Sequence, residues 1–203
     1  GICIFDADND TAPDVYITKS GFALAKGNTA YADKLYLNDG KGNFVADTLA
    51  IPALPGSKTC VKAADIDADG DLDLFVGGRV IPGEYPKPES GYLLVNNSSN
   101  GKVQFSLATQ SLAPDLENIG MITDAVFLDI DNDNDPDLII TGEWMGIRFF
   151  TNNKGHFIPL ETPAGKAIGW WNSITSADID NDGDMDFIAG NYGLNGLYKA
   201  SGT

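Results

Sequence analysis

Aspartate residues on alternate positions form one nine-residue pattern that occurs four times in this chain. Three copies, D-I-D-A-D-G-D-L-D, D-I-D-N-D-N-D-P-D and D-I-D-N-D-G-D-M-D, span residues 65–73, 129–137 and 178–186, and a looser copy, D-A-D-N-D-T-A-P-D, spans residues 6–14. Carboxylates packed this densely repel one another unless a cation neutralises them. Because Ca²⁺ takes roughly six to eight oxygen ligands in a flexible geometry, we expect calcium loops, holding up to four ions in all.

In each copy, positions 1, 3, 5 and 9 offer carboxylates that can surround one ion, and position 7 offers a backbone carbonyl. The candidate metal ligands are Asp6, Asp8, Asp10, Ala12 and Asp14; Asp65, Asp67, Asp69, Asp71 and Asp73; Asp129, Asp131, Asp133, Asp135 and Asp137; and Asp178, Asp180, Asp182, Asp184 and Asp186. A carbonyl ligand at position 7 explains why alanine is tolerated there in the first copy. An EF-hand needs a glutamate at position 12 between two helices. These loops have apolar residues at position 12 (Ile17, Val76, Ile140 and Ala189), so they are not EF-hands.

Position 6 of the pattern is expected to need a left-handed backbone conformation. Gly70 and Gly183 adopt that conformation without strain, Asn134 tolerates it, and Thr11 does not. The first loop is therefore predicted to be the weakest or most distorted of the four. The alternative is a set of aspartate-rich turns held by side-chain to backbone hydrogen bonds without a metal, which would leave several like charges unpaired.

The acidity of the chain is concentrated in these loops. The formal net charge is −16, the isoelectric point is about 4.1, and 4 of the 29 acidic residues lie in the first loop and 5 in each of the others. Four calcium ions would bring the net charge from −16 to −8. The 13 basic residues are scattered, so we expect no binding to nucleic acid. No apolar run reaches the length of a membrane span, so we expect no direct membrane insertion.

The calcium requirement also bears on location. Weak loop sites suit the millimolar calcium outside cells, which predicts a secreted, periplasmic or cell-surface protein. The chain begins in an apolar run without a methionine, which predicts an excised fragment or a processed chain.

Short apolar runs flank every loop in the same order. One run precedes each loop (2–5, 61–64, 126–128 and 174–177), a second follows it (15–17, 74–76, 138–140 and 187–189), and a third comes later (35–37, 92–95, 147–150 and Leu197 with Tyr198). In three repeats a polar turn then leads to a phenylalanine, at Phe44, Phe105 and Phe157. Such β-branched and aromatic runs bounded by Gly or Asn predict strands joined by hairpins.

Four short strands per repeat are the plan of a propeller blade. We therefore predict an all-β fold, a β-propeller or partial propeller of about four four-stranded blades, in one region spanning residues 1–203. The repeats are placed at about 1–48, 59–108, 121–160 and 172–203, the last incomplete. The runs after the loops are apolar on consecutive residues, which predicts strands covered on both faces by neighbouring blades.

The acidic loops, the D-L-F-V-G-G and D-F-I-A-G-N strands and the L-Y-L-N-D-G-K-G-N-F hairpin resemble the FG-GAP/VCBS repeats of integrin α-type β-propellers. The segments G-G-R-V-I-P-G-E-Y-P-K-P, G-E-W-M-G-I and G-W-W-N-S resemble large secreted or surface bacterial proteins in which such repeats accompany an ASPIC/UnbV-type region. The resemblance implies that calcium holds the loop joining the first two strands of each blade.

Propellers of that kind usually close with about seven blades, and this chain has fewer than four complete ones. Three arrangements stay open: the remaining blades are missing, four blades close a small ring, or two chains complete one ring. Open blade edges expose unpaired strands, so self-association through them is a further expectation.

Outside the loops, Trp144, Trp170 and Trp171 are the candidate ligand-binding residues. Burial between blades is the more ordinary interpretation of such rings, and exposure on a propeller face would let them stack on sugars. Glu143 adjoins Trp144, either as a ligand contact or as a solvated or interface carboxylate.

The stretch 82–88, P-G-E-Y-P-K-P, predicts a stiff surface loop. Cys3 and Cys60 are expected as two buried thiols, with a disulfide as the alternative.

These features favour a non-catalytic extracellular module, stabilised by calcium, for adhesion or binding of a protein or glycan ligand. An architectural spacer within a larger surface protein is the first alternative, and a propeller-based carbohydrate-active enzyme, such as a polysaccharide lyase or glycosidase, is the second. A glycosidase needs two carboxylates beside a substrate groove. The acids outside the loops show no diagnostic pair spacing: Glu84, Glu89, Asp115, Glu117, Glu143 and Glu161. The single histidine, His156, is expected in a solvated turn, so no catalytic triad is predicted.

Overall fold

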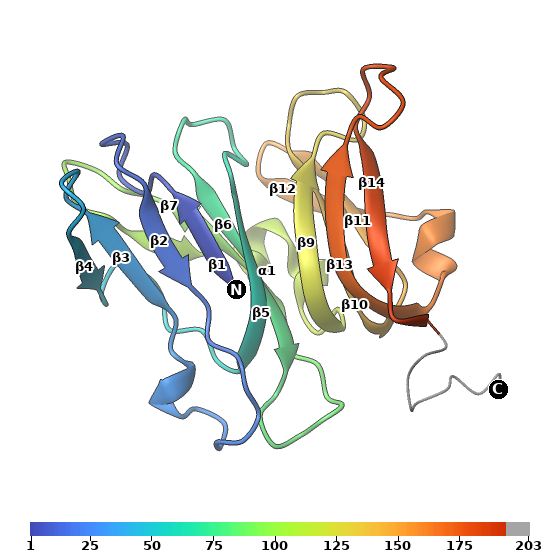
Figure 1. The fold of residues 1–203 in the computed structure, drawn as a ribbon, viewed down its shortest axis with the longest axis horizontal. Coiled ribbons are helices and arrows are strands. Elements are labelled where there is room, and N and C mark those ends of the chain that lie inside the picture. Colours follow the sequence, from blue (N-terminus) through green and yellow to red (C-terminus); the bar gives the residue numbers. More distant parts are fainter. Residues whose placement is uncertain (194–203) are drawn as a thin grey trace.

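The computed structural model describes residues 1–193, which form antiparallel sheets in chain order (Figure 1). The first blade consists of β1 (Ile2–Phe5), β2 (Asp14–Ile17), β3 (Lys34–Asn38) and β4 (Phe44–Asp47). The second consists of β5 (Ser57–Ala64), β6 (Asp73–Val80), β7 (Gly91–Asn96) and β8 (Phe105–Leu107). The third consists of β9 (Met121–Leu128), β10 (Asp137–Met145), β11 (Arg148–Asn153) and β12 (His156–Leu160). The described part of the fourth blade consists of β13 (Gly169–Ala177) and β14 (Asp186–Asn191).

The all-β prediction with four-stranded blades is confirmed. The strands overlap the predicted apolar runs, but β5, β6, β9, β10 and β13 are several residues longer than those runs. In the first two blades the fourth strand begins at the predicted phenylalanine, Phe44 or Phe105. The expected third strand of the last repeat, at Leu197 and Tyr198, lies outside the described residues. Helical structure in the described part consists of short turns: η1 (Thr29–Tyr31), α1 (Thr109–Leu112), η2 (Pro114–Leu116) and η3 (Pro163–Lys166).

In the second and third blades, the second strand is buried on both of its faces. In β6, Leu74 and Val76 pack in the apolar cluster shared with the first blade, whereas Phe75 between them packs in the cluster shared with the third blade. Residues 138–140 of β10 alternate in the same way between the second and fourth blades. Because successive side chains of a strand point to opposite faces, a continuous apolar run covers both. The prediction of strands covered on both sides by neighbouring blades is confirmed for β6 and β10. It is wrong for β14, where Ile188 is 58 % exposed, and one face of β2 is only half-buried, because in the described residues these two strands have a neighbouring blade on one side only.

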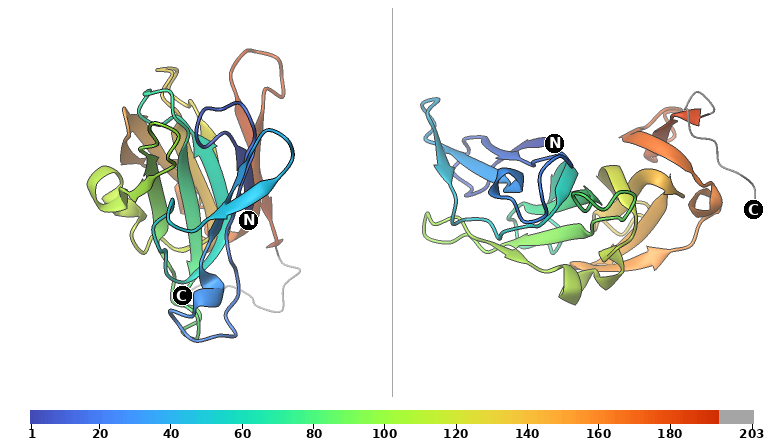
Figure 2. Two further views of the ribbon diagram at one scale, coloured as in Figure 1. Left: turned by 90° about the vertical axis from the view of Figure 1, so that its left-hand side faces the viewer. Right: turned by 90° about the horizontal axis from the view of Figure 1, so that it is seen from below.

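The blades follow one another in an open arc, and the described residues do not close into a ring (Figure 2). The first strands lie next to one another along the arc, where β5 contacts β1 and β9, and β9 contacts β13. The third and fourth blades also share backbone hydrogen bonding, because the end of β10 pairs with the start of β13 at Glu143 and Trp170. Together they form a six-stranded sheet. None of the helices described is long and apolar enough to cross a membrane.

A buried ion pair joins the first two blades. The Nζ atom of Lys58 lies 3.3 Å from the Oδ1 atom of Asp33 and donates hydrogen bonds to the carbonyl oxygens of Tyr31 and Leu54. Burial lowers the pKa of Lys58, and attraction to Asp33 offsets part of that shift. Cys3 and Cys60 are both free thiols. The expectation of two buried thiols is confirmed for Cys60 and is wrong for Cys3, which is half-buried.

Candidate metal loops

Each acidic loop connects the first two strands of its blade, and all four loops lie at the same end of the molecule, at the top of Figure 1. Their backbones are held by the aspartates at positions 1 and 5. In the second loop, Asp65 accepts hydrogen bonds from the amides of Asp69 (3.1 Å) and Gly70 (3.0 Å), and Asp69 accepts one from the amide of Asp71 (2.9 Å). The first and third loops repeat all three bonds. These hydrogen bonds from backbone amides to carboxylates fix the curvature of each loop.

The aspartate at position 9 ties the loop to the blade. In the second loop, one carboxylate oxygen of Asp73 accepts from the amide of Ile66 (3.1 Å), and the other accepts from the amide of Asn96 on the third strand (2.7 Å). Asp14 and Asp137 make the same pair of bonds in their blades. All three side chains are buried. A carboxylate at this position therefore sets where the loop closes, besides carrying charge.

The backbone conformation at position 6 confirms the sequence prediction. Gly70 and Gly183 have φ angles of 94° and 97°, and Asn134 has a φ of 72°. Thr11 also adopts a left-handed conformation, with φ of 73°, which is unfavourable for a β-branched residue. Position 4, which the sequence did not single out, is left-handed in every copy as well: Asn9, Ala68, Asn132 and Asn181.

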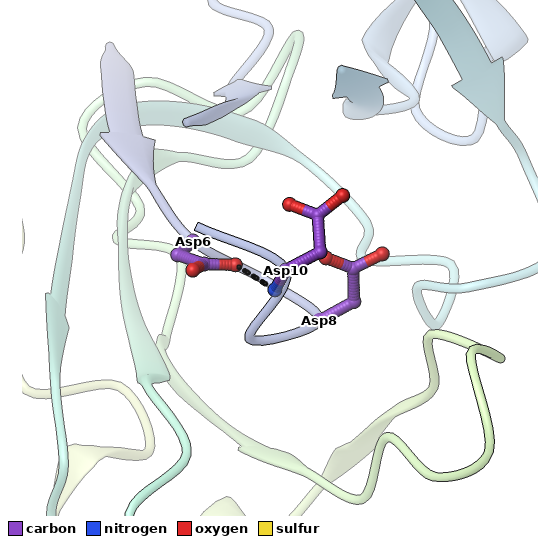
Figure 3. A group of neighbouring side chains, drawn as sticks. All are labelled: Asp6, Asp8 and Asp10. Carbon is purple, nitrogen blue, oxygen red and sulfur yellow. Dashed lines mark hydrogen bonds between the residues drawn. The ribbon is translucent and has the colours of Figure 1, made fainter. Parts of the chain in front are cut away.

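Three carboxylates converge in every loop, with one oxygen from each lying within 4.8 Å of the others. In the second, third and fourth loops these are the aspartates at positions 1, 3 and 9: Asp65, Asp67 and Asp73; Asp129, Asp131 and Asp137; and Asp178, Asp180 and Asp186. In the first loop they are Asp6, Asp8 and Asp10 (Figure 3). The closing aspartate is thus outside the group in the loop that carries threonine at position 6. The candidates at positions 5 and 7 of the other loops lie outside these groups of three.

The electrostatics of the loops favour a bound cation. Burial and the neighbouring carboxylates raise the pKa of Asp73 to about 7, even though two backbone amides donate to it. The same two causes raise the pKa values of Asp8, Asp67 and Asp131. In the first loop, the Oδ1 atom of Asp8 is buried and has no hydrogen-bond partner. The side-chain to backbone hydrogen bonds expected for metal-free aspartate-rich turns are present, but they leave the carboxylate charges without a counterion.

The donor set identifies the class of cation that fits. The converging atoms are oxygens, with no histidine or cysteine in any of the four groups. Zinc sites in proteins are built mainly from nitrogen and sulfur, whereas calcium takes carboxylate and carbonyl oxygens on flexible loops. The residues present therefore fit Ca²⁺.

Asparagines at the end of the third strand connect the loops of successive blades. The side-chain nitrogen of Asn152 donates to the carbonyl of Pro136 in its own loop (3.2 Å) and to that of Ile66 in the preceding loop (2.8 Å). Asn96 makes the equivalent bonds to Leu72 and to Ala7 of the first loop. Sequence reasoning did not select these residues, although an asparagine at the start of each polar turn (N-D-G, N-N-S and N-N-K) was a signal for them.

The sequence matches the family described as FG-GAP-like repeat over residues 6–76 and 129–189, which is more than half of the chain. The chain belongs to the FG-GAP-like repeat family. No curated protein shows significant similarity to it.

The two matched segments of FG-GAP-like repeat begin at the first aspartate of a loop and end in the second strand of the next described blade. They contain all four acidic loops. The resemblance drawn from the loop and hairpin motifs is therefore confirmed at the level of the repeat.

The three tryptophans lie at the opposite end of the blades, and they divide into two groups. The rings of Trp144 and Trp170 pack together, with centroids 5.0 Å apart. Trp171 instead packs against the core cluster between the third and fourth blades, and its indole nitrogen donates to the carbonyl of Ala167 (3.0 Å). The core interpretation thus describes Trp171, whereas Trp144 is 37 % exposed.

Replacing Asn152 with alanine is predicted to destabilise the FG-GAP-like repeats by about 2–4 kcal/mol, because the carbonyls of Ile66 and Pro136 and the amide of Gly155 lose a buried partner. Chemical denaturation measures the loss. The neighbouring exposed residue Asn153 is the matched control, and Asn153→Ala should change stability by less than about 0.5 kcal/mol. Equal effects of the two substitutions would contradict the bridging role.

Replacing Thr11 with glycine is predicted to stabilise the protein by about 1 kcal/mol, because glycine adopts the left-handed conformation without the steric cost that threonine carries. The gain is smaller than that cost, since glycine also makes the unfolded chain more flexible. The reciprocal substitution in the second loop, Gly70→Thr, should destabilise. Thermal melting of both variants tests the pair, and a neutral or destabilising Thr11→Gly would refute the strain argument.

Proposed function

We propose that this chain is a non-catalytic extracellular module, stabilised by calcium, that binds a protein or glycan ligand. The observation that supports it best is the recurrence of one loop geometry in four blades, with three convergent carboxylates in each loop. Calcium at these loops would be structural. The ions would neutralise carboxylates that burial and mutual repulsion otherwise penalise, and would fix the relative positions of successive blades through Asn96 and Asn152.

The proposed location follows from the calcium requirement. Carboxylate loops of this kind bind calcium usefully where its concentration is millimolar, which is outside the cytosol. A secreted, periplasmic or cell-surface setting meets that condition. The acidic character of the chain opposes partners with phosphate backbones, so the proposed partner is a protein or a glycan.

The proposed binding role is supported by the different side chains at the two ends of the blades. The acidic loops occupy one end, and an aromatic cluster lies at the other, in which Trp144 and Tyr85 are exposed and Trp170 is half-buried. Such rings offer flat apolar area together with hydrogen-bonding groups, a combination common at recognition sites. Self-association through open blade edges is a separate prediction, which the molar mass in solution would check.

The test is a glycan and matrix-protein binding array, run with millimolar calcium and with chelator. Circular dichroism of each sample establishes that the protein is folded before binding is measured. Selective binding that requires calcium would support the module. No binding by the folded, calcium-loaded protein would favour the architectural spacer, and product release from a polysaccharide would favour the enzyme.

A further inference from the structure

A cavity of about 350 Å³ lies at the end of the blades opposite the acidic loops. It is bounded by the β6–β7 loop, the end of β10 and the segment that contains η3, and its lining includes Pro86, Met121, Glu143, Trp144, Arg148 and Lys166. The volume is within the range of small-molecule sites, about 300–1,000 Å³. The predicted stiff loop at residues 82–88 thus forms one wall of this cavity.

Two charged groups of the lining have a buried atom that no protein group satisfies. Glu143 is only 4 % exposed, and its Oε1 atom accepts from the Nε atom of Arg79 (2.7 Å), while its Oε2 atom is buried without a hydrogen-bond partner. The Nε atom of Arg148 is also buried and has no partner. Buried polar atoms are nearly always hydrogen-bonded in native proteins, because an unpaired one is costly. Both residues line the cavity, so an acceptor and a donor with unused hydrogen-bonding capacity lie beside it.

The backbone presents an aromatic ring beside these groups at a conformational cost. Trp144 has a φ angle of 61°, a conformation that is rare for a large side chain. It lies at the irregularity between Glu143 and Met145, where β10 pairs with β13. Its ring packs against Trp170, and its indole nitrogen donates to the hydroxyl of Tyr85 (3.4 Å). Strain of this kind is typical of binding sites.

The charge of the cavity is opposite to that of the rest of the protein. Arg148 and Lys166 line it, and Arg79 contacts Glu143 from the neighbouring blade, so three cations accompany one carboxylate. The chain as a whole has a formal charge of −16, concentrated at the other end in the loops. A local excess of cations favours an anionic ligand, whereas the free carboxylate oxygen needs a hydrogen-bond donor from that ligand.

A carboxylated sugar satisfies these requirements together, because it carries an anionic group, hydroxyl donors and a ring face. We propose that the cavity binds a uronic acid residue of a glycan, with its ring against Trp144, a hydroxyl donating to Glu143 and its carboxylate accepting from Arg148 and Lys166. This inference rests on the proposed binding function and specifies its ligand class. An acidic peptide supplies the anion but lacks the hydroxylated ring.

Isothermal titration calorimetry of the calcium-loaded chain tests the proposal with three probes: a trisaccharide of galacturonic acid, its methyl ester and an acidic hexapeptide. The free acid should bind at least about tenfold more tightly than the ester, the effect expected for a hydrogen bond to a charged group. The hexapeptide should bind no more tightly than the ester. Arg148→Gln and Lys166→Gln should each weaken binding of the acid by about tenfold or more. Lys102→Gln, an exposed lysine in the β7–β8 turn near the loops, is the matched control and should leave affinity unchanged.

Trp144→Gly tests the ring separately, because glycine relieves the backbone strain and preserves folding while removing the stacking surface. Equal binding of acid and ester, equal binding of the peptide, or full affinity of the Arg148→Gln variant would each overturn the proposal. If the chelator abolishes binding of the acid but the Arg148→Gln variant still binds it, the acid binds at the calcium loops and the proposal fails. A different ligand on the array would overturn the uronate proposal and leave the binding function standing. No ligand for the folded protein would overturn both.

Discussion

Removing calcium is expected to lower the melting temperature by about 10 °C or more. Extracellular loop sites have dissociation constants of about 0.1–1 mM, so 10 mM calcium adds about 1.4–2.7 kcal/mol per site through preferential binding to the folded state. Three or four such sites therefore contribute at least several kcal/mol, and each kcal/mol corresponds to about 2–4 °C in a chain of this size. Differential scanning calorimetry in calcium and in chelator measures the shift.

Magnesium is the matched control cation, and it should stabilise much less because it dehydrates reluctantly and demands a smaller octahedral site. Asp67→Asn removes one convergent carboxylate and should abolish about one site's share of the stabilisation. An unchanged melting temperature after complete chelation would reject calcium as a structural ion in these loops.

The calcium effect is expected to be larger at pH 8 than at pH 5. The pKa of Asp73 in the metal-free folded state is raised to about 7, above its ordinary value of 3.8. The folded state then binds more protons than the unfolded state between these values, so the stability of the metal-free protein falls as the pH rises through about 7. Calcium replaces the proton, and its stabilisation is fullest where Asp73 is ionised.

Replacing Lys58 with methionine is expected to cost about 3–5 kcal/mol, the usual consequence of leaving one member of a buried ion pair without its partner. Lys58 is fully buried, and its ammonium group is the counterion of Asp33. The carbonyls of Tyr31 and Leu54 lose a donor as well. Chemical denaturation monitored by tryptophan fluorescence measures the change.

Lys62→Met is the matched control, because the ammonium of Lys62 lies 3.0 Å from a carboxylate oxygen of Asp124 but its side chain is 35 % exposed. A partly exposed pair contributes about 1 kcal/mol or less. The double variant Lys58→Met with Asp33→Asn removes both charges and should recover part of the loss. Equal losses of unfolding free energy for Lys58→Met and Lys62→Met would show that burial of an ion pair does not determine how much the pair stabilises the protein.

The repeat architecture could be predicted from the sequence because its signals are local. The order of strand, loop and strand follows from apolar runs that lie next to the aspartates, and the burial of β6 on both faces follows from three consecutive apolar residues. The left-handed conformation at position 6 follows from Gly70 and Gly183, since glycine marks such positions. Strand ends were less predictable, because Gly77 and Gly78 continue β6 only through pairing with a neighbouring strand.

Aspartate spacing and strand periodicity alone thus determined the four acidic loops, the fold class and the family resemblance, because both act within about ten residues of chain. Which three carboxylates converge in each loop was decided by the folded backbone. The tertiary structure decided what depends on residues distant in sequence. It placed Asn152 against Ile66 and paired Lys58 with Asp33. It also packed Trp171 in the core, paired Arg79 with Glu143 and placed Arg148 in the lining of the same cavity as Glu143. Contacts between blades are set by packing of whole sheets, and no local pattern records which residues meet there.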